Sequence, residues 1–300
     1  MTETQFLALE GNINSIFAAY AKCKKDFIPD LYNIITKETA QFTDYTYGAS
    51  GRMNPWSGSV KYDDIEPGYT KQYRADKYDT GIQVDRDWYE DKEYERIKTI
   101  VQTKLDGVLT TLQYESVDIL NEAFSAAKYT GPDGAALISA THHMVPDDDH
   151  QSNSGVEELT YEGHEATVLA MENLTNDRGD KMLLQANRVI AGPYYRDTCK
   201  KLYGSTKEAF INDNQENIYK DFDYYIHPLM TGRNWFMVNK ESMKGGSGLN
   251  WFMRRDPRKL ERDGATAQGD FNTEKLSWKA IGRWKKGWTN WFWIYGNRVS

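Results

Sequence analysis

Apolar residues recur at intervals of three and four over the segment Ile97–Phe124, apart from one longer gap. This spacing is the period of an amphipathic α-helix, so we expect the longest helix of the chain here. Asp87 and Glu90 have the spacing of a capping box, with Asp in place of Ser or Thr, and they mark its predicted start. An unbroken helix over Trp88–Lys128 would be about 60 Å long. The alternative is two ordinary packed helices divided near Gly107.

The segment Gly48–Asp85, which precedes this helix, has too little aliphatic content to fold alone. Residues 1–45 begin with apolar positions at helical spacing, which indicates an arm with one short helix. Farther on, Val60 and Tyr62 alternate with polar neighbours, as in a half-exposed strand. A returning strand is predicted from the apolar positions Tyr69, Tyr73, Tyr78, Ile82 and Val84. We therefore expect a long two-stranded excursion whose apolar side rests on another surface.

The rest of the chain mixes helical and strand patterns and predicts an α+β fold. Thr160 can cap a helix, and a second helix is expected over 193–203. Strands are predicted over 182–191, 222–228 and 234–239. The last segment alternates at period two from Leu276 to Trp284, turns at Lys286-Gly287 and continues as Trp288–Tyr295.

The composition adds an abundance of aromatic residues. The chain of 300 residues contains 20 Tyr, 11 Phe and 9 Trp, and both protein interfaces and sugar-binding sites use such side chains. The net charge of -7 has the wrong sign for a protein whose main task is coating nucleic acid. Cys23 and Cys199 are isolated, so neither a disulfide framework nor a metal cluster is expected. No signal peptide and no membrane-spanning run of apolar residues is found in the sequence.

Candidate chemistry is sparse. His164-Glu165 begins like a zinc-protease helix, but Val168 stands where the second histidine is needed. The run Asp147–Asp149 reads as a solvated acidic loop. His142-His143 has no second cluster beside it, which favours loop hydrogen bonding or a subunit contact over catalysis. We therefore expect no enzyme activity, no cofactor and no metal.

Several segments, taken in order, resemble the major capsid proteins of tailed bacteriophages. Residues 80–91, with the sequence TGIQVDRDWYED, resemble the end of the extended loop and the start of the spine helix in that family. Residues 136–142, ALISATH, followed by Ser152-Asn153, resemble the stretch where a small apolar strand leads to a His and an Asn. The pattern of helix, turn, strand and helix over 159–205 follows, and Asn212, Asn214, Asn217, Pro228-Leu229 and Trp235 continue it. The resemblance covers about residues 30–300, is strongest to the Mu-like head-subunit branch, and rests on the order of the motifs.

This resemblance implies the Hong Kong 97 capsid fold. The implied regions are an N-terminal arm (1–45), an extended loop (46–84), a peripheral domain with a long spine helix (85–150 and 250–287), and an axial domain (151–249 and 288–300). The implied function is a major head protein that forms hexamers and pentamers of an icosahedral shell around double-stranded DNA. Such a protein is made in the bacterial cytoplasm and resides in the virion. Its implied partners are further copies of itself, a portal protein and a decoration protein, with no membrane and no sequence-specific DNA binding. Because the arm starts almost at Met1, we also expect a separate scaffolding protein.

The expected intersubunit contacts come from exposed-looking aromatic and basic residues. They are Phe17, Tyr20, Trp56, Tyr69, Tyr73, Arg254 and Arg255. The alternative for each aromatic residue is packing within its own chain. The tryptophans of the last strands are expected in the core, namely Trp278, Trp284, Trp288, Trp291 and Trp293. Two other functions stay open: a carbohydrate-binding or carbohydrate-cleaving protein, and an encapsulin-like cargo shell.

Overall fold

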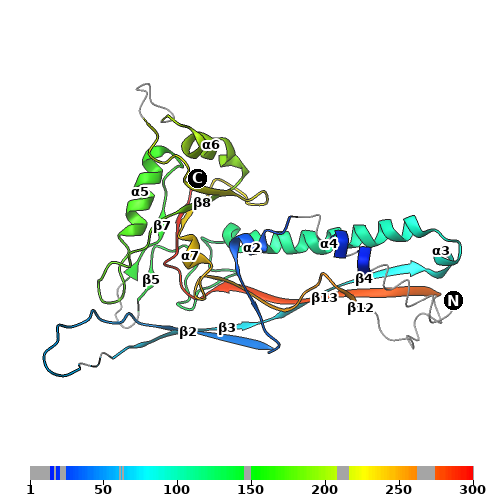
Figure 1. Ribbon diagram of the computed structural model, residues 1–300, viewed down its shortest axis with the longest axis horizontal. Coiled ribbons are helices and arrows are strands. Elements are labelled where there is room, and N and C mark those ends of the chain that lie inside the picture. Colours follow the sequence, from blue (N-terminus) through cyan, green and yellow to red (C-terminus); the bar gives the residue numbers. More distant parts are fainter. Residues whose placement is uncertain are drawn as a thin grey trace.

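The structure is a computed structural model that describes residues 14–16, 18–20, 25–60, 62, 64–144, 150–207, 216–261 and 274–299. Three parts are visible in Figure 1: a long limb of helix and sheet, a compact unit above one end of it, and a hairpin that projects beneath that unit. Phe17, Cys23 and the acidic run Asp147–Asp149 lie outside the described residues.

The limb is a five-stranded sheet with one long helix along it (Figure 1). The strand order is β1-β11-β13-β12, and β4 pairs with β13. The strands are β1 (Asn33–Thr36), β4 (Asp76–Asp85), β11 (Leu249–Arg255), β12 (Leu260–Glu261) and β13 (Lys275–Trp288). Alternate residues of β13, among them Trp278 and Ala280, are buried in one cluster with Val101 and Leu105 of the helix. The period-two pattern of this strand thus meets the helical pattern of residues 97–124.

The predicted long helix is confirmed over α4 (Tyr94–Asn121), which has 28 residues and is about 42 Å long. Its predicted start is wrong, because Asp87 lies inside a separate short helix, α3 (Arg86–Glu90). The two helices are divided at residues 91–93, where Lys92 has a φ of 62°. Gly107 does not interrupt α4.

The compact unit is a second five-stranded sheet, in the order β7-β14-β10-β8-β9, with helices packed on it. Its strands are β7 (Ser154–Gly155), β8 (Arg188–Ala191), β9 (Asp223–Ile226), β10 (Trp235–Val238) and β14 (Ile294–Asn297). Its helical segments are α5 (Tyr161–Glu172), η1 (Pro193–Tyr195), α6 (Arg196–Gly204) and α7 (Lys240–Met243), and a short pair, β5 (His142–His143) and β6 (His150–Gln151), lies beside it. The Thr160 cap is confirmed, since its Oγ1 accepts from the Gly163 N–H at 3.1 Å.

The hairpin consists of β2 (Gln41–Tyr47) and β3 (Pro67–Arg74). The outgoing strand expected at Val60 and Tyr62 is wrong, since neither residue is in a strand. Tyr78, Ile82 and Val84 do not return along the hairpin either. They belong to β4 and pair with β13 of the limb.

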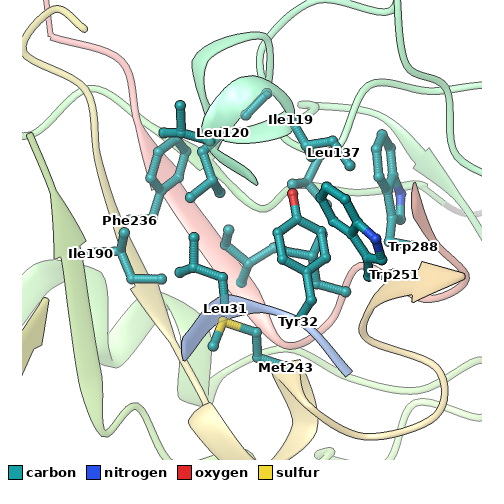
Figure 2. Close-up of a cluster of buried hydrophobic side chains, with 14 of the residues drawn as sticks. Leu31, Tyr32, Ile119, Leu120, Leu137, Ile190, Phe236, Met243, Trp251 and Trp288 are labelled. Carbon is teal, nitrogen blue, oxygen red and sulfur yellow. The ribbon is translucent and has the colours of Figure 1, made fainter. Parts of the chain in front are cut away.

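A hydrophobic core joins the limb to the compact unit (Figure 2). It draws on both sheets, on the end of α4 and on α2 (Ile28–Leu31). Its side chains include Leu31, Tyr32, Ile119, Leu120, Leu137, Ile190, Phe236, Met243, Trp251 and Trp288. The five tryptophans expected in the core are all buried, which confirms that prediction.

Three strand predictions are corrected by this arrangement. β13 runs without a turn through Lys286-Gly287 and ends at Trp288. Residues 135–140 are a loop, not a strand, although Leu137 and Ile138 are buried. The strand expected over 182–191 is confined to β8.

Candidate assembly surface

The described residues between β2 and β3 are 48–60, 62 and 64–66, which we call the tip loop, and they extend to the left end of the molecule in Figure 1. They expose large apolar side chains to water. Met53 is 98% exposed, Tyr62 is 94% exposed and Trp56 is 75% exposed, and Val60 and Ile65 are exposed as well. A cluster of exposed apolar residues of this kind marks an interaction site. The tip loop is therefore the first candidate for a functional surface.

The base of the tip loop is fixed to a turn of the compact unit, residues 176–180. Both carboxylate oxygens of Asp177 accept from the Ala49 N–H, at 2.9 and 3.1 Å. Arg178 donates from Nε to the Ala49 carbonyl at 2.8 Å and from Nη2 to the Asp64 carbonyl at 2.9 Å. Arg52 forms an ion pair with Asp180. We call Asp177, Arg178 and Asp180 the loop clamp.

The loop clamp is itself a well-ordered turn. The Asn176 side-chain oxygen accepts from the backbone N–H groups of Arg178 and Asp180, at 3.0 and 2.8 Å. Gly179 has a φ of 78°, a conformation that glycine adopts readily. The turn therefore presents its charged side chains to the base of the tip loop in one arrangement.

Of the predicted contact residues on the hairpin, Trp56 is on the tip loop and exposed, and Tyr69 is half-buried on β3. Tyr73 is only 1% exposed. Its ring stacks on Phe42 at 5.8 Å between ring centres, and its hydroxyl is 3.0 Å from Thr289 Oγ1. Burial raises the pKa of Tyr73 to about 12. This ring is packed within its own chain, which is the stated alternative to an intersubunit contact for Tyr73.

The other predicted contact residues lie on the limb. The Tyr20 hydroxyl donates to Asp106 Oδ2 at 2.9 Å, which places the arm against α4. Arg254 and Arg255 are half-buried at the end of β11, where Arg255 forms an ion pair with Glu261 of β12. The structure thus does not bring these residues together with Trp56.

His142 is part of a buried hydrogen-bond network, which is one of the two roles expected for His142-His143 from the sequence. Its Nδ1 is 2.6 Å from Asp133 Oδ2, its Nε2 is 3.2 Å from Asn153 Oδ1, and its ring stacks on Trp291 at 4.2 Å. Asn153 also donates to the carbonyls of Leu137 and Ile294. The network connects the loop that contains Asp133 and Leu137 to Asn153 and β14 of the compact unit. Because its side chains are enclosed by protein, its role is structural.

The described residues contain no group of three or more His, Cys, Asp or Glu side chains placed to hold a metal ion. Within the same residues, none of the helices has the length and apolar character that a membrane span requires.

No protein-family model and no curated protein matches the chain. Solved structures do match it. The procapsid protein of bacteriophage JBD30 is 12% identical with a TM-score of 0.54, and the alignment covers 100% of this chain and 77% of that one. A protein of Microbacterium phage Oxtober96 is 10% identical with a TM-score of 0.53, and 92% of each chain is covered.

The chain has the Hong Kong 97 capsid fold. A virus-like particle from Pyrococcus furiosus is also similar, with 8% identity, a TM-score of 0.52, and coverage of 97% of this chain and 99% of that one. The fold predicted from the sequence is confirmed. The assignment to the Mu-like branch stays a prediction.

Proposed function

We propose that this chain is the major capsid subunit of a bacteriophage, which assembles into hexamers and pentamers of a closed icosahedral shell around double-stranded DNA. The observation that carries the proposal is the tip loop, whose apolar side chains are exposed and whose base is hydrogen-bonded to the loop clamp. The shared fold with phage capsid proteins supports it.

Weak contacts between subunits add up in a closed shell. An isolated subunit leaves Met53, Trp56 and Tyr62 in water, and an assembled subunit can cover them. Each contact supplies only a few kcal/mol, but closed symmetry repeats it in every copy, so the shell persists although single contacts are weak.

The proposal includes partners of the shell. A separate scaffolding protein would organise the growing shell, a portal protein would occupy one vertex, and a decoration protein would bind outside. The packaged DNA would be held without reading its sequence, because the chain carries 37 basic against 44 acidic residues. The finished location would be the virion. We also propose the regions 1–45, 46–84, 85–150 with 250–287, and 151–249 with 288–300 as arm, extended loop, peripheral domain and axial domain. Within the region 46–84, the last residues form β4 and pair with β13 of the limb.

An encapsulin-like cargo shell is the second candidate, and the similarity to the Pyrococcus furiosus particle supports it. The content of purified particles separates the two: a phage shell made with its packaging genes contains DNA, and a cargo shell contains protein. A portal or terminase gene beside this one also favours the phage.

The carbohydrate hypothesis loses its main support. It required tryptophans on exposed strands as stacking platforms, whereas Trp235, Trp251 and Trp288 and the other tryptophans of the strands are buried.

Sedimentation of the purified chain tests the proposal. We expect an equilibrium between subunits or capsomers and particles far larger than any compact oligomer, shifted toward the particles at higher protein concentration. A single species with the mass of one chain, 34.6 kDa, at every concentration and salt would contradict it.

A further inference from the structure

β5 and β6 form a short two-stranded ribbon, with β5 at the lower end of the compact unit in Figure 1. The strands pair antiparallel, with His143 opposite His150 and His142 opposite Gln151. Residues directly opposite each other in such a pair project from the same face, and neighbours along a strand project from opposite faces. The ribbon therefore places the imidazoles of His143 and His150 together on one face and the ring of His142 on the other.

The five histidines of the chain fall into two groups. His142, His164 and His227 are buried, with exposed fractions of 0%, 1% and 0%. His143 and His150 are exposed. Their ring centres are 4.3 Å apart, and the ring planes make an angle of 85°. The fold thus brings the two exposed histidines into contact, although they are not neighbours in the sequence.

The separation of these two rings suits a shared metal ion. With nitrogen–zinc distances of about 2.0–2.1 Å, two imidazoles bound at right angles to one ion have ring centres about 4.5 Å apart. The torsion that rotates a histidine ring about its Cβ–Cγ bond is soft. Each ring can therefore turn a nitrogen toward a common point without a change in the backbone of the ribbon.

The surroundings of His143 leave room for the water molecules of a coordination sphere. His143 lines two surface cavities, of about 200 Å³ beside the base of the tip loop and about 540 Å³ beside the loop that follows Asp133. Asp133 lines both cavities too, but its carboxylate is 2.6 Å from His142 Nδ1 and accepts from the Ala135 N–H at 3.2 Å. Between these two residues, the imidazole of His143 is therefore the available ligand.

We propose that His143 and His150 bind one divalent transition-metal ion, and we call this pair the bis-histidine site. The two imidazoles are the protein ligands, and water molecules occupy the other coordination positions. Imidazole is a ligand for zinc, copper and nickel, whereas calcium and magnesium take oxygen ligands. The site lies within one chain, so it does not depend on the proposed function.

A bound ion would fasten β5 to β6, because each strand supplies one ligand. The ribbon has only two pairs of residues, and a two-stranded ribbon is marginally stable by itself. Metal binding to a folded site adds to the stability of that fold. The consequence expected of the ion is therefore a more stable ribbon at the edge of the compact unit.

Calorimetric titration of the purified chain with Ni²⁺ tests the bis-histidine site. We expect one ion per chain. His150→Ala and His143→Gln should each weaken Ni²⁺ binding by at least about tenfold, since even changes next to a metal ligand cost this much. Thr141→Ala, at an exposed position beside β5, should bind Ni²⁺ like the wild type. Thermal unfolding without metal should be unchanged in all three variants, because all three side chains are exposed.

The stoichiometry distinguishes a shared ion from separate ones. Two independent surface histidines would bind two ions, and removal of one histidine would lower the number of bound ions without lowering the affinity. That result would overturn the proposal. Equal Ni²⁺ affinity of the wild type and His150→Ala would overturn it too.

Amide hydrogen exchange tests the fastening of the ribbon. Ni²⁺ should slow the exchange in residues 142–143 and 150–151 of the wild type and leave His150→Ala unaffected. Nickel binding that leaves the exchange of these amides unchanged would contradict a bridge between β5 and β6.

Discussion

Replacement of Trp56 by Ala separates the stability of the subunit from the stability of the shell. An aromatic side chain can bury about 150–250 Å². Since Trp56 is 75% exposed, about 150 Å² is available to a partner, equivalent to ~4 kcal/mol at 25 cal/mol per Å². If about half of this burial free energy contributes to the subunit contact, the variant loses ~2 kcal/mol per contact. Each subunit donates one tip loop, so the concentration at which assembly begins should rise about 30-fold.

The assay is light scattering over a dilution series, with urea unfolding of the unassembled chain measured in parallel. The free energy of unfolding should change by no more than about 0.5 kcal/mol, because the side chain is largely in water. Trp56→Phe retains most of the apolar area and should assemble at nearly the wild-type concentration. An unchanged assembly threshold for Trp56→Ala would refute the assignment of the tip loop as the contact surface.

Three further predictions concern the clamp, the core and two buried histidines. Arg178→Ala removes two hydrogen bonds to the tip loop, so amide hydrogen exchange in residues 48–66 should accelerate, and unchanged protection would contradict the clamp. Trp251→Ala leaves a cavity in the hydrophobic core that joins the limb to the compact unit, and it should reduce the free energy of unfolding by about 3–5 kcal/mol in urea titrations, in contrast to Trp56→Ala. Burial lowers the pKa of His164 and of His227 to about 4 in the folded chain, with a further lowering of the His227 value by Lys25. The unfolded chain takes up these protons below about pH 6.5, so stability should be constant above that pH and fall by about 2 kcal/mol per histidine at pH 5. His164→Gln should remove about half of this slope, and a pH-independent stability of the wild-type chain would contradict the burial argument.

The periodic segments of the sequence predicted the fold well. The helical repeat of α4 and the alternation of β13 each extend over enough residues to be distinguished from a chance pattern, and both match the structure. Gly287 was misread as part of a turn. A Cβ at Gly287 would lie 2.7 Å from the ring of Tyr73, so this glycine allows the hairpin to pack closely on β13. Residues 73 and 287 are far apart in the sequence, so their contact produces no local sequence pattern from which it could be predicted.

The candidate surface was only partly predictable for the same reason. Trp56 was expected as a contact residue because it is an aromatic residue in the predicted extended loop. The loop clamp was missed, because Asp177 and Arg178 contact residues more than 100 positions earlier in the chain. Asn176 and Gly179 were the available signal, since both are typical of a tight turn. Val60 and Tyr62 alternated like a strand, but a strand needs a partner, and none pairs with them in the part of the chain that the structure describes.

Electron microscopy of the purified chain, expressed with and without its neighbouring genes, tests the central claim most directly. The account predicts closed icosahedral particles, or regular hexamers and pentamers, in at least one of these preparations. A monodisperse monomer in every preparation would contradict the assignment as a shell subunit.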